Sequence, residues 1–188
     1  VSGNPIPKIG YFGWKTWELS FDGVRVPHAN MLGEEGKGFY VASIGLEVAR
    51  AHTAARALGL ARGALEDALV YAKERVQFGK PIGEFQLIQL KLAKMEVARM
   101  NLRNIVFRQI EMSAQGAALS FAEASACKLY AAGAAVEVAL EAVQLFGGNG
   151  YMAEFQVEQL ARDAKVLQIY AGTDEIQITH IAKDLLRA

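Results

Sequence analysis

The chain has little cysteine and proline and no net charge. One of its 188 residues is cysteine, four are proline, and 20 basic residues balance 20 acidic ones. A single cysteine excludes an intrachain disulfide, and we expect a reducing compartment. A net charge of zero provides no overall field that would attract nucleic acid or an anionic membrane. The composition therefore argues against a disulfide scaffold and against a polyanion-binding protein.

Uninterrupted long apolar runs are also missing. Charged residues break every apolar stretch and no signal peptide is visible, so we expect neither a membrane span nor secretion. Cys127 lies in a helix-like apolar stretch, where a lone thiol packs as a small core residue. His28, His52 and His180 share no metal-ligand spacing, and no Ser/His/Asp set can be assembled. These patterns predict no metal site and no hydrolase.

Residues 1–36 are typical of β-structure. Most of the prolines lie here, and two alternating stretches, 17–21 and 24–27, flank Asp22 and Gly23. This pattern predicts two short strands around a tight turn. Because long helices follow at once, we expect residues 1–36 to be the end of a β-domain that is mostly absent from this chain.

The remainder is predicted to be helical. Apolar residues recur at helical spacing, Ser120 offers an N-cap, and Gly116 and Gly147 interrupt the pattern. We expect helices over residues 39–72, 84–113, 120–146, 157–163 and 173–187. Alanines crowd the first and third of these, which predicts seams where helix axes approach closely. The predicted fold class is mainly α: an antiparallel four-helix bundle over residues 37–188 with a short β fragment before it.

Three segments join helix ends to glycine and polar residues, where ligands often bind. In residues 74–83, Arg75 and Lys80 could pair with a phosphate and Phe78 could lie against a flat ring. Residues 144–151 hold three glycines in four positions, whose N–H groups could cradle an anion. Each segment also has an ordinary structural explanation, as the C-terminal end of a helix.

The third segment is Gly172-Thr173 at the start of the last predicted helix. Backbone N–H groups at a helix N-terminus favour anions. Asp174 and Glu175 in the first turn would repel a phosphate, and Thr173 is by itself an ordinary N-cap.

Together the segments resemble the acyl-CoA dehydrogenase family at that family's spacing. The matching motifs are Arg75-x-Gln77-Phe78-Gly79, Phe85-Gln86, Gln144-Leu145-Phe146-Gly147-Gly148-Asn149-Gly150, Arg162-Asp163-Ala164-Lys165 and Tyr170-x-Gly172-Thr173. Residues 19–27, 32–33 and 36–39 resemble the end of the family's middle β-domain. The resemblance spans nearly the whole chain.

This resemblance implies an FAD cofactor between the middle β-domain and a bundle that assembles into tetramers. Flavin pyrophosphate and adenosine would meet Arg75, Val76, Gln77 and Phe78, with Phe85 and Gln86 at the adenine end. The FAD of a neighbouring subunit would be reached by Gln144, Leu145, Phe146, Gly147 and Gly148. The pyrophosphate would also be approached by Thr173, Asp174 and Glu175.

The family's reaction is α,β-desaturation of an acyl-CoA, in which a carboxylate takes the α-proton. In most family members the residue that carries this carboxylate stands at the position of Ala171, and in some branches it stands at the position of Ala49. Neither side chain can accept a proton, whereas the Ala171 N–H, which in the family polarises the thioester, is kept. By resemblance, Glu47, Arg50 and Gly172 would bind substrate.

Four hypotheses remain open. The chain is the C-terminal portion of an FAD-dependent acyl-CoA dehydrogenase, or a non-catalytic FAD half-site in a hetero-oligomer whose partner supplies the base. The third hypothesis is a helical assembly module that has lost the desaturation activity, and the fourth is an enzyme in which Ala171 is an introduced substitution. The resemblance implies an acyl-CoA substrate, a homo- or hetero-tetramer, an electron-accepting flavoprotein partner, and a bacterial cytoplasmic or mitochondrial matrix location.

Overall fold

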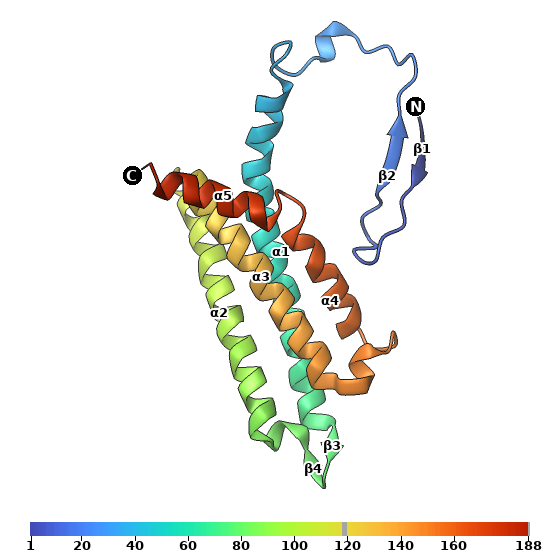
Figure 1. The fold of residues 1–188 in the computed structure, drawn as a ribbon, viewed down its shortest axis with the longest axis vertical. Helices are drawn as coiled ribbons and strands as arrows, with labels where there is room; N and C mark the ends of the chain where they lie inside the picture. The colour runs from blue at the N-terminus through green and yellow to red at the C-terminus, as the bar shows by residue number, and fades with distance from the viewer. Residues whose placement is uncertain (118–119, 188) are drawn as a thin grey trace.

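A computed structural model describes residues 1–117 and 120–187, apart from the side chains at positions 44, 46, 47 and 113. It confirms the predicted fold class, a bundle of long antiparallel helices with short strands at the N-terminal end (Figure 1). The α-helices are α1 (Gly38–Glu74), α2 (Gln86–Ala114), α3 (Phe121–Phe146), α4 (Val157–Lys165) and α5 (Asp174–Leu185). Short 3-10 turns are η1 (His28–Asn30), η2 (Ile82–Glu84), η3 (Gly147–Tyr151) and η4 (Val166–Gln168).

The core of the bundle is a seam of small residues between α1 and α3. Most of the buried alanines recur every three or four residues on both helices, which keeps them on one face. They are Ala54, Ala57, Ala61, Ala64, Ala68 and Ala72 on α1, with Ala131, Ala132, Ala135, Ala139 and Ala142 on α3. Methyl groups allow the two backbones to approach closely, so the predicted seam is confirmed. Larger residues, including Met95 and Leu102 of α2 and Val157 and Leu167 beyond the seam, complete the core.

The ends of α3 follow the predicted signals. Ser120 and Glu123 form a capping box, in which Ser120 Oγ accepts from the Glu123 N–H at 3.1 Å and the Glu123 carboxylate accepts from the Ser120 N–H at 2.8 Å. This backbone donor lowers the pKa of the Glu123 carboxyl. Gly147 ends the helix at φ +60°, a left-handed conformation that favours glycine.

One helical stretch in the described part of the chain, Phe121–Tyr151, is long and apolar enough to cross a membrane by length and composition alone. Half of its most apolar window is buried inside the protein. A core helix satisfies the same criterion, and the alanine seam accounts for the apolar character of this one.

The N-terminal strands differ from the prediction. β1 (Ser2–Pro5) pairs antiparallel with β2 (Trp17–Ser20), with Ser2 opposite Ser20. The strand predicted over 17–21 is therefore found, but residues 24–27 are not a strand. Pro27 has no N–H to donate to a ladder, and β2 takes its partner from upstream instead.

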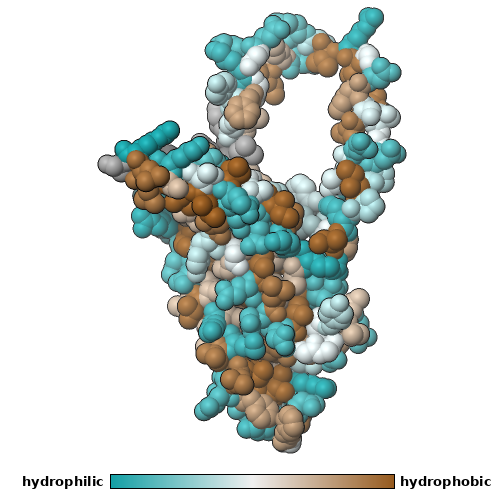
Figure 2. Space-filling view, in the orientation of Figure 1, coloured by the Kyte–Doolittle hydropathy of each residue, from teal (hydrophilic) through white to brown (hydrophobic). Residues whose placement is uncertain are grey.

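The hairpin and the arch that joins it to α1 leave large apolar side chains uncovered. Figure 2 shows apolar residues scattered along this ring-shaped part of the surface. Trp17, Phe21 and Leu32 are 49%, 66% and 78% exposed. An apolar surface of this extent is typical of a segment that packs against further protein.

Candidate functional site

The turn before α5 is held in a rare conformation. Ala171 lies at φ +54° and Gly172 at φ +91°. The side-chain amide of Gln177 donates to the Ala171 carbonyl at 3.2 Å and to the Gly172 carbonyl at 3.0 Å, and Gln177 is fully buried. Thr173 then caps the helix, accepting from the Ile176 N–H at 3.4 Å. The Gln177 side chain therefore fixes the peptide planes on both sides of Gly172.

The helix N-terminus is less repulsive to anions than its sequence predicts. The fully buried ammonium of Lys128 on α3 donates to Asp174 Oδ1 at 2.9 Å. This internal ion pair neutralises one of the two acidic residues in the first turn. The exposed Glu175 keeps its charge, since hydrogen bonds from its own N–H and from Thr173 lower the pKa of its carboxyl.

Chemically, this turn can polarise a carbonyl but cannot remove a proton. The Ala171 N–H has no acceptor among residues 1–117 and 120–187, so it is available to a ligand oxygen. The Ala171 side chain is a methyl group. Ala49 on α1 is likewise a methyl, so neither predicted base position carries a carboxylate.

Arg50, predicted to bind substrate, lies inside a cluster at the upper end of the bundle. It is 3% exposed, and its guanidinium lies 4.0 Å from the ring centre of Phe121. Phe121 also contacts His180, and the centres of their rings are 4.5 Å apart. Burial and the nearby Arg50 charge lower the pKa of His180. The side chain of Glu47, the second predicted substrate contact, lies outside the described part of the structure.

The first predicted cofactor segment forms a small hairpin at the opposite end of α1. β3 (Val76–Gln77) pairs with β4 (Lys80–Pro81), and Phe78 at the tip is 93% exposed with φ +51°. Arg75, Val76, Gln77 and Gln86 are exposed as well. The Phe85 ring lies 6.1 Å from that of Phe78, edge to face, and Lys80 Nζ lies 4.6 Å from it.

The second predicted segment lies beside the first. The Phe146 ring stacks on Tyr71 of α1 at 3.9 Å, and the Asn149 amide donates to the Tyr71 hydroxyl at 2.9 Å. Gln144, Gly147 and Gly148 are exposed, whereas Leu145 and Phe146 are buried in the core. The last two side chains are thus structural here, and only their backbone could meet a ligand.

The third predicted segment lies far from the other two within one chain. Figure 1 shows β3 and β4 at the lower end of the bundle and the start of α5 near the upper end. Arg50 lies on α1 and Arg75 directly follows the last residue of this helix. The 25 residues between them correspond to about 37 Å at 1.5 Å per residue. One small molecule therefore cannot contact both ends of a single copy, and a site that uses all three segments needs a second copy.

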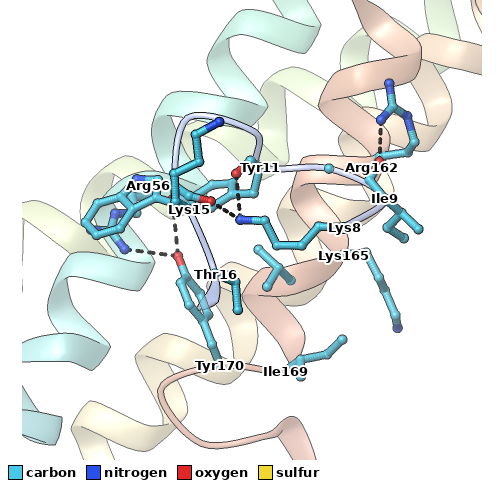
Figure 3. Close-up of a pocket in the computed structure, with 13 residues that line it drawn as sticks. Lys8, Ile9, Tyr11, Lys15, Thr16, Arg56, Arg162, Lys165, Ile169 and Tyr170 are labelled. Carbon is cyan, nitrogen blue, oxygen red and sulfur yellow. Dashed lines mark hydrogen bonds between the residues drawn. The ribbon is translucent and has the colours of Figure 1, made fainter. Parts of the chain in front are cut away.

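A cavity missed by the sequence analysis opens between the N-terminal loop and α4. Its volume is about 630 Å³, and Lys8, Tyr11, Trp14, Arg56 and Tyr170 are among its walls (Figure 3). Arg162 seals one side by donating to the Ile9 carbonyl, and Asp163 accepts from the Tyr11 N–H. In the sequence, the signal for this cavity is the Arg162-Asp163 pair, which belongs to a family motif but does not by itself indicate a contact with residues 9–11.

Tyr170 connects this cavity to the α5 turn, because it directly precedes Ala171. Its hydroxyl accepts from Arg56 at 3.2 Å and lies 3.5 Å from the Tyr11 hydroxyl. Burial and the hydrogen bond with Tyr170 raise the pKa of Tyr11 to about 12, so this phenol is neutral at pH 7. Among residues 1–117 and 120–187, no group of three His, Cys, Asp or Glu side chains could hold a metal ion.

Residues 36–186 match the model of the acyl-CoA dehydrogenase C-terminal domain. The chain is 50% identical over 179 residues to an acyl-CoA dehydrogenase of Bacillus subtilis, covering 95% of this chain and 47% of that protein. It is 42% identical to a mitochondrial isovaleryl-CoA dehydrogenase of Oryza sativa, covering 97% and 44%.

Solved structures agree. Butyryl-CoA dehydrogenase from Megasphaera elsdenii superimposes with a TM-score of 0.93 at 45% identity, covering 98% of this chain and 48% of that one. The chain belongs to the acyl-CoA dehydrogenase family and carries that family's C-terminal helical domain. It spans about half the length of the curated relatives it matches.

Proposed function

We propose that this chain forms the C-terminal part of an FAD-dependent acyl-CoA dehydrogenase, which introduces an α,β double bond into an acyl-CoA thioester. The observation that carries the proposal is the α5 turn: Gln177 fixes the peptides around Gly172 while the Ala171 N–H stays available to a thioester oxygen. Gly172 admits this arrangement, since a Cβ there would overlap the Gln177 amide. Residues 1–36 would then be the end of a middle β-domain, and residues 37–188 the helical domain.

The exposed lower end of the bundle fits a flavin dinucleotide. Phe78 is 93% exposed and in a left-handed conformation, which costs free energy and is typical of ligand-binding turns, and it is flanked by the exposed Arg75 and Gln77. Arginine pairs with a pyrophosphate and Phe78 offers a flat apolar face. When bound, FAD would supply the electron acceptor for the desaturation. This chain would bind it at Arg75 to Phe78 and at Gly147 and Gly148, in an assembly of at least two copies.

The other assignments follow from the same proposal. The assembly would be a homo- or hetero-tetramer that takes an acyl-CoA and passes electrons to a flavoprotein partner. The bacterial and mitochondrial relatives support a cytoplasmic or mitochondrial matrix location.

The test uses the full gene product. It should purify with the absorbance bands of bound flavin, and Ala171→Glu should raise acyl-CoA-dependent ferricenium reduction by about a hundredfold or more, the usual contribution of a general base. Ala171→Gln is the matched control, because it has the same size but cannot accept a proton. Absence of flavin from the purified protein contradicts the proposal.

A second function has a specific observation in its favour. Because Ala171 and Ala49 both lack a carboxylate, the chain would instead serve as a non-catalytic FAD half-site whose partner supplies the base. This alternative predicts flavin binding without desaturation by the protein purified alone, and activity when the partner is added. Rapid turnover by the purified chain by itself excludes it.

A further inference from the structure

The cavity between the N-terminal loop and α4 has an unbalanced charge. Among the residues that the structure describes, five cationic ones line it, namely Lys8, Lys15, Arg56, Arg162 and Lys165, and no acidic one does. Two neighbouring carboxylates, Glu158 and Asp163, are already engaged. Glu158 holds Arg162 through two hydrogen bonds of 2.7 Å, and Asp163 accepts from the Tyr11 N–H.

The four other cations have no carboxylate within ion-pair distance in the described part of the chain. Lys8 donates only to the carbonyl oxygens of Tyr11 and Trp14, and Lys165 to the Gln168 amide. The neutral phenol of Tyr11 does not offset them. Such a cavity concentrates positive potential and favours an anionic ligand.

The arrangement of Arg56 favours a carboxylate attached to an apolar body. Its guanidinium lies 5.1 Å from the Trp14 ring centre and 6.0 Å from that of Tyr170, and one nitrogen is fixed on the Tyr170 hydroxyl (Figure 3). A planar guanidinium held in this way presents its remaining donors in a fork that matches a carboxylate. Trp14, Ile169 and Tyr170 supply apolar surface around it.

We propose that this cavity binds an organic carboxylate through Arg56 and, resting on the proposed function, that this carboxylate is the far end of the acyl group of a dicarboxylic acid thioester. The link to the acyl group is Tyr170, which lies in the cavity wall and directly precedes the Ala171 N–H assigned to the thioester. Arg56 is then a specificity-determining residue.

The first experiment measures binding and needs no activity. Calorimetric titration of the full gene product with glutarate should detect saturable binding, whereas glutaramide, a neutral analogue of similar shape, should not bind. Arg56→Gln should weaken glutarate binding at least tenfold, about 1.4 kcal/mol. Arg62→Gln is the control: Arg62 lies on the same helix, is exposed and pairs with Glu66 outside the cavity. It should leave binding unchanged.

Three results would overturn the carboxylate site. The first is equal binding of glutarate by the parent protein and Arg56→Gln, and the second is no binding of glutarate at all. The third is tighter binding of inorganic phosphate than of glutarate, which would identify a phosphate site instead.

The second experiment addresses the acyl group, using the Ala171→Glu protein. We expect its kcat/KM for glutaryl-CoA relative to pentanoyl-CoA to fall at least tenfold in the Arg56→Gln background, through loss of glutaryl-CoA turnover alone. An equal fall for both thioesters refutes the specificity role. If neither thioester is turned over, the proposed function fails, while the glutarate titration still decides the carboxylate site.

Discussion

The buried ammonium of Lys128 and the carboxylate of Asp174, 2.9 Å apart, fasten the first turn of α5 to the N-terminal third of α3. Lys128 is fully buried, and Asp174 is partly buried with 17% of its side chain exposed. A buried charge without its partner costs several kcal/mol. The position of the Ala171 N–H therefore depends on an ion pair that no local sequence pattern predicts.

Asp174→Asn should lower the free energy of unfolding by about 2–3 kcal/mol, because it leaves the Lys128 ammonium buried without a counter-charge. Urea unfolding followed by circular dichroism measures this change. Lys128→Met combined with Asp174→Asn should recover more than half of the loss, since no unpaired charge remains. Glu175→Gln, at the exposed carboxylate of the same turn, should stay within about 0.5 kcal/mol of the parent. Similar urea midpoints for the Asn and Gln variants would argue against the ion pair.

Ala171→Gly should stabilise the protein by about 1 kcal/mol. The left-handed φ of +54° is unfavourable for alanine and free of strain for glycine. The same substitution at Ala55, an exposed position inside α1, should destabilise by about 1 kcal/mol, since glycine is a poor helix former. Thermal unfolding should thus give shifts of opposite sign, and shifts of the same sign would show that the turn is relaxed.

Phe78→Gly should separate stability from ligand binding. Glycine relieves the left-handed φ of +51°, so the unfolding free energy should rise by up to about 1 kcal/mol. Loss of the exposed ring should weaken FAD binding at least tenfold, about 1.4 kcal/mol, in a flavin-quenching titration of the apoprotein. Leu186→Gly is a control, since it removes an 87% exposed side chain at the far end of the bundle. Unaltered FAD affinity of the Phe78 variant would place the cofactor elsewhere.

His180 should make stability depend on pH on the acidic side. Burial and Arg50 lower the pKa of its imidazole in the folded protein below the ordinary value of about 6.5. The stabilisation from a neutral His180 is thus fully present above pH ~6.5 and is lost as pH falls, because the unfolded chain takes up the proton more readily. Urea midpoints between pH 7.5 and 5 should fall less steeply in His180→Gln. A His180 resonance in NMR that titrates at or above the ordinary value would contradict the prediction.

Local signals in the sequence located most of the helices well. Ser120 with Glu123 predicted the start of α3, Gly147 its end, and the alanine spacing its contact with α1, because each depends on near neighbours or on a regular period. The strand expected over 24–27 was wrong, since the partner of β2 is the upstream strand β1, with Ser2 opposite Ser20 and Pro5 opposite Trp17. Strand pairing is a choice between distant segments, which periodicity does not rank.

The candidate site divides in the same way. Arg75, Gln77 and Phe78 were recognisable because their motif is continuous in the chain. The cavity around Arg56 was not, since it joins Tyr11, Arg56 and Tyr170 from three separate segments. Leu145 and Phe146 lie within a recognisable motif, yet packing turns their side chains into the core.

The sequence by itself determined the family, the helical architecture and the absence of a carboxylate at positions 49 and 171, because each is written in residue identity and spacing. Only the three-dimensional structure decided how the α5 turn is held, by Gln177 and by the Lys128–Asp174 pair, and that four cations with no carboxylate partner in the described part of the chain surround one cavity. Burial and charge balance are properties of side chains brought together from distant parts of the chain, and they exist only once the helices have packed.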